Sequence, residues 1–376
     1  MAHADNRGKA AGQPGVDLLV VGGGVMGLWT ALHAARSGRS VTLVEKRRIG
    51  SGASGKKGFQ FEALVSLEAE IAALEAETGL SAGYRRSGRL IPLPKPHNRD
   101  LALRTANEAL SVWQTPDRSF AFEVLDTAPV SGWPAPAVMA HGVVYDHLAA
   151  RLAPRALVTA LKTALGQRAS VTIREGVGVA SLDPDAAIAR LDDGTDLSFG
   201  HCVLSPGVEA FDLLASFSQP VARPFGSAVK GQAALLRASV DPALPVIFAD
   251  GLYVVPHEDG LVAVGSTSES DFVEPYGTDG LLDALIDRAR LTAPVLADAP
   301  VVERWAGLRP RAIGREPMVG RHPDHARISL MAGGFKVSFG IAHRLARQVL
   351  NEIEGGTLDV PPSFAVAAHF EEARRL

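Results

Sequence analysis

The chain has 376 residues, of which 47% are apolar and 21% are charged, and its formal net charge is −3. This length allows two domains with a sizeable core, and the balanced charge gives no reason to expect nucleic acid or an anionic membrane surface as a partner. The single cysteine, Cys202, excludes a disulfide scaffold and a cysteine-rich zinc site, and it fits a cytoplasmic protein. Residues 1–15 lack the apolar core of a signal peptide, so we expect a disordered leader, and we expect no transmembrane segment.

The stretch 16–47 has the pattern of a β-strand, a helix and a second strand. The apolar run Val16–Val21 is followed by Gly22, Gly24 and Gly27 in the spacing G-x-G-x-x-G, and a helix is predicted from Val25 to Ser37. The first glycine permits a tight turn, the second lets a pyrophosphate approach the backbone, and the third lets the helix pack closely on the strand. The free N–H groups at the start of the helix favour phosphate binding, so the stretch predicts a dinucleotide site.

Glu45 ends the second strand, 18 residues after Gly27. A carboxylate at this distance can accept hydrogen bonds from ribose hydroxyls and disfavours a 2′-phosphate, which argues against NADP. The motif alone does not distinguish NAD from FAD. The loop that follows contains Ser51, Ala53 and Ser54 among several glycines, and it can either wrap a phosphate or flavin or be an ordinary surface loop.

The rest of the chain alternates between helical and strand patterns. Helices are predicted around Leu64–Leu74 with a cap at Gly79, and over Arg99–Trp113, Pro154–Gly166, Asp279–Ala293 and Gly340–Glu354. Strands are predicted over 84–92, Ser170–Ile173, Val177–Leu182, Ile188–Leu191, Asp196–Phe199, Cys202–Leu204, Gln232–Leu236, Leu252–Val255, Leu261–Val264 and Ile328–Met331. Residues 116–145 are expected to be irregular with short strands.

These elements predict an α/β protein in which a Rossmann-like nucleotide-binding domain is interleaved with an α+β domain built on an antiparallel sheet. We expect the nucleotide domain to comprise residues 16–80, 146–220 and 305–376, and the substrate domain to comprise residues 81–145 and 221–304.

Several motifs together resemble one family. The N-terminal βαβ unit, the GSGASG loop after Glu45, the P-x-x-L-x-x-A-L helix, YVVPHEDGLVAVGS, WAGLRPRAIGREPMVGRHP and the glycine-rich strand before the last long helix occur in this order. The chain from residue 16 onward is similar to the FAD-dependent D-amino-acid oxidase superfamily, and within it to glycine oxidase and monomeric sarcosine oxidase. The resemblance implies that FAD is the cofactor and that a hydride passes from the carbon bearing an amine to flavin N5, after which the imine hydrolyses. It also implies reoxidation by O2 or another acceptor, and it allows a homo-oligomer.

The resemblance implies roles for individual residues. Arg309, in WAGLRP, matches the arginine that pairs with the substrate carboxylate, and Tyr253 matches the tyrosine that helps to fix it. Lys336 matches a lysine of sarcosine oxidase that contacts the same carboxylate. The implied FAD contacts are Gly22, Gly24, Val25, Met26, Gly27, Glu45, Lys46, Arg47, Ser51, Ala53, Ser54, Val179, Gly207, Gly334, Phe335, Lys336, Val337, Ser338, Gly340 and Ile341.

The chain also departs from its nearest likenesses. Gly251 and Ser268 stand where glycine oxidase has larger pocket side chains, which leaves the substrate open. The cysteine that attaches FAD covalently in sarcosine oxidase has no counterpart, so we expect non-covalent FAD. The histidines have no metal-ligand spacing, and no metal is expected.

Three other functions fit parts of the pattern. A flavin dehydrogenase of a 2-hydroxy acid would use the same carboxylate clamp, and a non-catalytic flavin-binding subunit would need only the cofactor site. An NAD-dependent dehydrogenase would share the N-terminal fingerprint alone.

Overall fold

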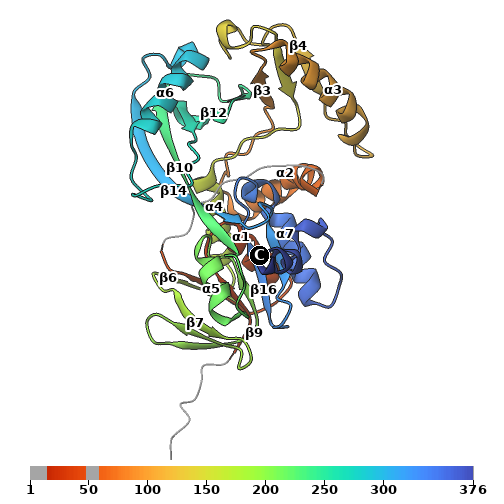
Figure 1. The fold of residues 1–376 in the computed structure, drawn as a ribbon, viewed down its shortest axis with the longest axis vertical. Helices are drawn as coiled ribbons and strands as arrows, with labels where there is room; N and C mark the ends of the chain where they lie inside the picture. The colour runs from red at the N-terminus through yellow and green to blue at the C-terminus, as the bar shows by residue number, and fades with distance from the viewer. Residues whose placement is uncertain (1–14, 48–58, 376) are drawn as a thin grey trace, which may run out of the picture. The chain divides into compact units, whose positions relative to one another are not determined.

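The computed structural model describes residues 15–47 and 59–375 (Figure 1). The chain divides into two compact units. The first is drawn from Met1–Gly55, Leu161–Ser227 and Pro310–Leu376, and the second from Lys56–Ala160 and Ala228–Arg309. The assignment of FAD binding to the first unit and of substrate binding to the second stays a prediction.

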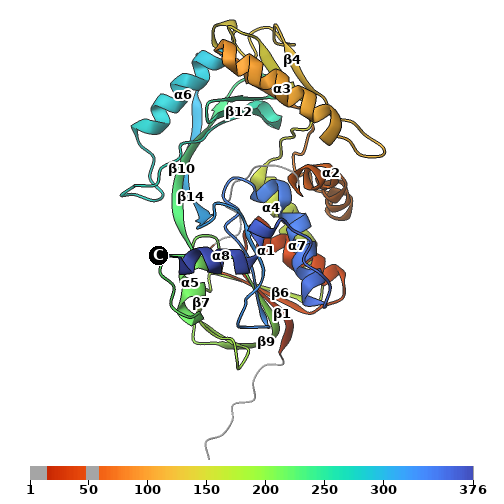
Figure 2. The ribbon, with the colours of Figure 1, turned by 45° about the vertical axis from the view of Figure 1, so that its right-hand side comes forward.

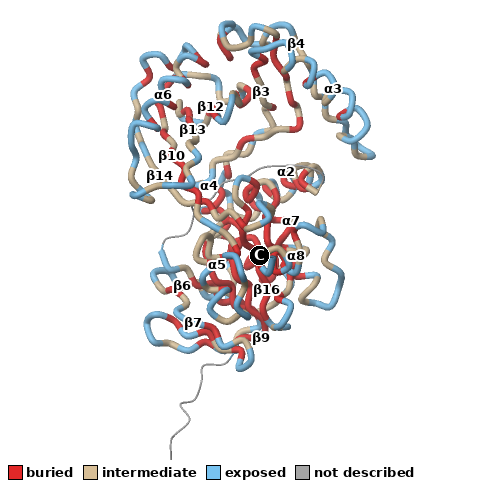
Figure 3. The backbone as a smooth tube through the Cα atoms, in the orientation of Figure 1, coloured by how far each residue is buried: buried red, intermediate tan, exposed pale blue. Residues whose placement is uncertain are grey.

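The first unit contains an eight-stranded sheet with the order β15-β16-β9-β1-β2-β6, to which β7 and β8 are added beside β9. The pairs β1·β2, β1·β9, β16·β9 and β2·β6 are parallel, whereas β15·β16, β7·β8 and β8·β9 are antiparallel. The strand bounds are β1 Val16–Val21, β2 Val41–Glu45, β6 Val171–Glu175, β7 Val179–Asp183, β8 Ile188–Leu191, β9 Asp196–Leu204, β15 Met318–Arg321 and β16 Ile328–Ala332. A mostly parallel sheet needs cover on both faces, and residues 18–21 of β1, residues 201–204 of β9 and all of β16 are accordingly buried. Figure 3 shows this burial at β9 and β16.

The helices of the first unit are α1 Val25–Arg36, α5 Glu209–Phe217, α7 Ser338–Ile353 and α8 Val366–Arg374, together with the second half of α4 Pro154–Gly166. Helices α1 and α7 pack side by side, as Figure 2 shows. Trp29 on α1 stacks on His33 and meets the ring of His343 on α7 edge to face. This contact joins the first crossover helix to the last long helix.

The second unit contains another eight-stranded sheet, with the order β14-β10-β13-β12-β11-β3-β5-β4. The strand bounds are β3 Arg89–Pro92, β4 Phe122–Leu125, β5 Val143–Asp146, β10 Gly226–Arg237, β11 Val246–Ala249, β12 Leu252–Pro256, β13 Leu261–Gly265 and β14 Val301–Ala312. Its helices are α2 Phe59–Thr78, α3 Pro96–Val112 and α6 Gly280–Thr292. Short 3-10 turns occupy Pro136–Val138, Glu258–Gly260, Pro294–Leu296 and, in the first unit, Pro362–Phe364.

The two faces of the second sheet differ in composition. On one face Ala234, Val262, Val264 and Val254 pack into a core with helix α6. Side chains alternate between faces along a strand, so the residues between these positions point to the other face. That face, called the open face below, carries Ala233, Gly265 and Tyr253 in one cross-strand row.

Most predicted elements are present, and one difference concerns β9. The runs Asp196–Phe199 and Cys202–Leu204 form one strand, because Gly200 and His201 continue the pairing. The early part of this strand pairs with β8, and the later part pairs with β1 and β16. No strand was predicted over β11, β14 or β15, and no helix was predicted over α8.

The observed helices and strands confirm the predicted α/β fold class, with one large sheet in each unit. Within the described residues, no helix combines the length and apolar character needed to cross a membrane.

Candidate functional site

The glycine-rich turn between β1 and α1 is shaped by backbone contacts. Gly22 has φ of +105°, and a Cβ there would lie 2.4 Å from the carbonyl oxygen of Ser205. A Cβ on Gly27 would lie 1.9 Å from the carbonyl oxygen of Gly22. Both positions therefore require glycine. A Cβ on Gly24, by contrast, would meet no atom within 4 Å. The backbone there is open, at the start of a helix whose first N–H groups have no partners within the helix.

Glu45 closes this turn from the neighbouring strand. Its Oε2 accepts a hydrogen bond from the Gly23 amide at 2.6 Å, and its Oε1 accepts one from the Arg47 amide at 2.7 Å. Each carboxylate oxygen keeps further acceptor capacity, which suits the hydroxyls of a ribose. An open glycine, a helix N-terminus and a fixed carboxylate together fit the adenosine diphosphate half of FAD.

The remaining adenosine-side residues lie around the carboxyl ends of β2 and β9. The stem of Lys46 packs against Gly178, whose Cβ would lie 3.1 Å from Lys46 Cγ, and Val179 follows as the first residue of β7. Arg47 Nη2 is 2.8 Å from Glu209 Oε1, in the first turn of α5. Gly207 has φ of +67° and stands open just before that helix. The predicted contacts Ser51, Ala53 and Ser54 lie outside the described residues.

The segment after β16 joins the same part of the first unit. A Cβ on Gly334 would lie 2.3 Å from Met26 Cε and 2.4 Å from Ser338 Oγ, so glycine brings this turn against the start of α1. Phe335 has φ of +40°, and its amide donates to the Pro310 carbonyl at 3.1 Å.

The helix that follows this turn begins earlier than predicted. Lys336 Nζ lies 5.3 Å from the Phe335 ring centroid, and Val337 caps α7. Helix α7 starts at Ser338 rather than Gly340, so Gly340 is in its first turn. Val25 and Ile341 are buried in the core, so contact with a ligand would be through their backbone.

Arg309 lies in the second unit, on β14, and only 8% of it is exposed. Its Nη1 donates to the carbonyl of Thr267 at 3.1 Å and to that of Lys230 at 3.5 Å, and its Nη2 donates to Ser266 Oγ at 2.5 Å. No acidic side chain of the described residues lies within ion-pair distance of this guanidinium. Burial lowers the pKa of Arg309, and the charge of Glu269 partly opposes that shift. A buried cation without a paired anion is costly, which makes this a favourable place for an incoming carboxylate.

Tyr253 lies on the same face of the second sheet as Arg309. A Cβ on Gly231 would lie 2.0 Å from Arg309 Nη1, so the guanidinium covers Gly231. Gly231 and Ala233 point to the same face, and Ala233, Gly265 and Tyr253 are cross-strand neighbours. Tyr253 is 36% exposed, and its ring lies 4.5 Å from that of Phe248. The open face thus carries both predicted carboxylate contacts of the second unit. Lys336, the third predicted contact, belongs to the first unit.

Sequence reasoning missed a polar cluster behind Arg309. It consists of Lys230, Gln232, Thr267, Glu269 and Asp279, and Lys230 and Gln232 are 2% and 0% exposed. The available signal was two polar residues, Lys230 and Gln232, on either side of Gly231 in the middle of a mostly apolar strand.

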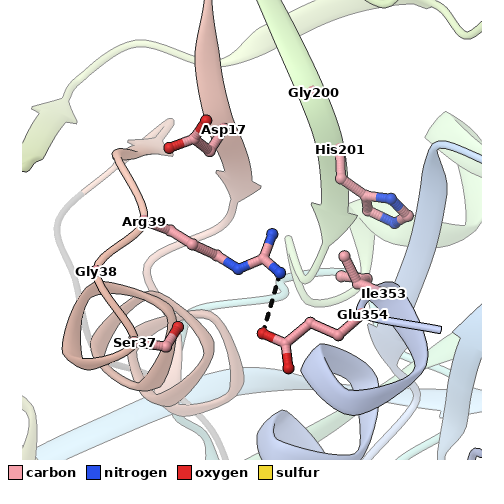
Figure 4. Close-up of a pocket in the computed structure, with 8 residues that line it drawn as sticks. All are labelled: Asp17, Ser37, Gly38, Arg39, Gly200, His201, Ile353 and Glu354. Atoms are coloured by element: carbon pink, nitrogen blue, oxygen red, sulfur yellow. Dashed lines mark hydrogen bonds and ion pairs between the residues drawn. The ribbon is translucent and has the colours of Figure 1, made fainter. Parts of the chain in front are cut away.

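A polar pocket of about 570 Å³ lies at the amino end of β1 and beside the middle of β9 (Figure 4). Arg39 and Glu354 form an ion pair of 3.0 Å in its wall, and Asp17 and His201 also line it. This pocket is at the end of β1 opposite the glycine turn and contains none of the predicted site residues. Across residues 15–47 and 59–375, no group of three or more His, Cys, Asp or Glu side chains is placed to hold a metal.

Comparisons with known proteins identify the family of the chain. The sequence pattern of the family described as "DAO: FAD dependent oxidoreductase" matches residues 17–348. Glycine oxidase of Pseudomonas putida is 28% identical over 341 residues, which is 85% of this chain and 89% of that protein. Glycine oxidase of Bacillus licheniformis is 24% identical, over 95% of this chain and 98% of that protein.

Solved structures share the fold. The crystal structure of glycine oxidase from Geobacillus kaustophilus has a TM-score of 0.81 at 21% identity, over 94% of this chain and 99% of that one. Iminodiacetate oxidase from Chelativorans has a TM-score of 0.80 at 20% identity, over 93% and 98%. The comparisons confirm the resemblance to the superfamily near glycine oxidase, and with it the FAD cofactor and the oxidoreductase class.

Proposed function

The chain belongs to the family of FAD-dependent oxidoreductases, and on that premise we propose that it oxidises the C–N bond of a small amine or amino acid that carries a carboxylate. One observation carries the choice of substrate: the buried guanidinium of Arg309 has no acidic partner among the described residues. A planar guanidinium can pair with both oxygens of a carboxylate, and such a pair would supply the missing countercharge.

FAD, when bound, supplies the chemistry by taking two electrons as a hydride from the carbon next to the nitrogen, and the resulting imine hydrolyses. The residues of the chain bind FAD and orient the substrate. Glu45 accepts from the ribose, the open backbone at Gly24 and the start of α1 receive the pyrophosphate, and the first turn of α7 offers backbone N–H groups with a positive dipole end. We assign non-covalent attachment to FAD.

Arg309 and Tyr253 fix the carboxylate and thereby the orientation of the carbon to be oxidised. Lys336 is assigned a second anion contact or a flavin contact. No side chain is assigned a proton transfer, because the described residues offer no acid–base pair beside Arg309. The names of the relatives support an amino-acid substrate, since glycine and iminodiacetate are both amines with carboxylates.

A second candidate is oxidation of a 2-hydroxy acid. The carboxylate clamp would serve that substrate equally well, and the observation that favours it is the same buried arginine. The fold also occurs in L-α-glycerophosphate oxidase from Mycoplasma pneumoniae, with a TM-score of 0.71 at 16% identity.

Anaerobic mixing of the FAD-loaded protein separates these candidates. We expect amino acids to bleach the flavin absorbance and 2-hydroxy acids to leave it unchanged. Bleaching by 2-hydroxy acids alone would select the second candidate, and no bleaching by either class would leave a flavin-binding protein without this activity. Comparing peroxide formation with dye reduction in air then identifies O2 or another acceptor.

A further inference from the structure

Two of the three acceptors that hold Arg309 come from one short segment. Ser266 and Thr267 directly follow β13, and they provide an Oγ and a carbonyl oxygen to the guanidinium. The third acceptor is the Lys230 carbonyl on β10. The position of Arg309 therefore depends on how residues 266–269 are fixed to β10.

The backbone ties this segment to β10 at two places. Lys230 and Glu269 exchange N–H···O bonds of 2.9 Å, and the Thr267 amide donates to the Gln232 carbonyl at 3.2 Å. The Gln232 amide in turn donates to Thr267 Oγ1 at 2.8 Å. Thr267 thus holds the guanidinium through its carbonyl and β10 through its hydroxyl.

Glu269 is the centre of the side-chain contacts. Its Oε1 accepts from the Thr267 hydroxyl and, at 3.1 Å, from Gln232 Nε2, and its Oε2 lies 3.6 Å from Lys230 Nζ. Its side chain is 11% exposed. A carboxylate that meets three donors in a buried place cannot be replaced by an amide without turning a donor towards one of them.

The cluster stands behind the arginine rather than beside it. Lys230 and Gln232 alternate with Gly231, so their side chains leave β10 on the face opposite to the guanidinium. They meet Asp279, the N-cap of α6, which lies 3.5 Å from Lys230 Nζ and accepts from Gln232 Nε2 at 2.9 Å. With Arg309 included, the cluster holds two cations, Lys230 and Arg309, and two anions, Glu269 and Asp279. Both anions pair with Lys230, and Arg309 has no ion-pair partner among residues 15–47 and 59–375.

We propose that Thr267 and Glu269 are positioning residues that hold Arg309 from behind in the geometry needed to bind a substrate carboxylate. This inference rests on the proposed function for its catalytic meaning, but carboxylate binding itself can be measured separately. Neither residue touches the substrate; each acts through the acceptors that fix the guanidinium.

The test measures acetate binding to the FAD-loaded protein by calorimetry, with sodium chloride at equal ionic strength as the blank. Thr267→Val keeps the shape and removes the hydroxyl, and we expect it to raise the acetate Kd about tenfold. Thr267→Ser restores the hydroxyl and should stay within about threefold of the original protein. The control is Asp283→Asn, on the same helix as the cap, where an exposed ion pair of 2.7 Å joins Asp283 to Arg304; its acetate Kd should not change.

Glu269→Gln distinguishes positioning from simple electrostatics. Removing a negative charge near Arg309 would, by Coulomb attraction alone, tighten acetate binding. Positioning predicts the opposite, a rise in Kd of about tenfold or more. In turnover, the KM of a carboxylate substrate should rise in parallel while kcat stays within about threefold.

Acetate binding that is unchanged or tighter in Thr267→Val and Glu269→Gln would overturn the inference. So would acetate binding that survives Arg309→Ala, or a lack of acetate binding by the original protein. If acetate binding depends on both positioning residues but no amine bleaches the flavin, the proposed function fails and the positioning role stands.

Discussion

The two units differ in how their sites are built. The glycine turn of the first unit is made by backbone: two glycines without room for a side chain, one open glycine and a carboxylate that accepts from main-chain amides. The Arg309 site of the second unit is assembled from three separate stretches, 230–232, 266–269 and 309, in which two backbone carbonyls and the Ser266 hydroxyl hold the guanidinium. A turn built by neighbouring residues appears in the sequence as a compact motif. A site assembled from distant strands appears only as isolated polar residues.

The largest effect is expected from a substitution in the glycine turn of the first unit. Gly27→Ala places a Cβ against the Gly22 carbonyl, and because neither backbone can yield cheaply we expect a loss of about 3 kcal/mol in unfolding free energy and loss of bound FAD. Gly24→Ala is the matched control, since its Cβ meets no atom: it should fold with normal stability and bind FAD more weakly. Thermal unfolding and flavin content measure both; equal stability of the two variants would contradict this account.

The Arg309 site is tested by Arg309→Ala. Loss of a desolvated charge pair should lower kcat/KM for carboxylate substrates by an amount equivalent to 2–5 kcal/mol, on the order of the cost of such truncations. Neutral amines should lose far less. Equal losses for both substrate types would remove Arg309 from carboxylate binding.

The two sites also differ in how far they can be predicted from the sequence. Gly22, Gly24, Gly27 and Glu45 could be assigned because their spacing along one βαβ unit fixes their positions in space. Arg309 and Tyr253 were assigned by resemblance, and their shared face became visible only with the strand register. The roles of Thr267 and Glu269 could not be predicted, because nothing in the sequence fixes the pairing of residues 266–269 with β10. Likewise, the joining of two predicted strands into β9 depends on neighbours from β8, β1 and β16.

Acid should affect the first unit more than the second. Burial lowers the pKa of His33 to about 3 and that of His201 and His322 to about 4, whereas in the second unit the same shift is found for His257. A lowered folded-state pKa means that the unfolded chain binds more protons below pH ~6.5, so this stability is present above that pH and is lost as the pH falls towards 4.

For His201 alone the loss between pH 7 and 4 is on the order of 2 kcal/mol. Denaturant unfolding at several pH values measures it, and His201→Gln should flatten the curve. A stability that does not change between pH 7 and 4 would contradict the neutral, buried histidines.

The smallest effect is expected at the Arg47–Glu209 ion pair. Both side chains are substantially exposed, and such pairs contribute about 0–1 kcal/mol. Glu209→Gln should therefore change unfolding free energy by less than about 0.5 kcal/mol, and added salt should remove even that difference. A large loss of unfolding free energy in Glu209→Gln would contradict the interpretation of this ion pair as solvent-exposed.

The most direct test of the central claim uses substrate pairs that differ only in the carboxylate. The FAD-loaded protein is mixed without oxygen with glycine or methylamine, and with N-methylglycine or dimethylamine, and the flavin absorbance is followed. We predict that at least one amino acid bleaches the flavin and that its decarboxylated partner does so far more slowly. Equal bleaching within every pair, or none by any amino acid in a wider series, would contradict the assignment of Arg309 and of the amino-acid oxidising function.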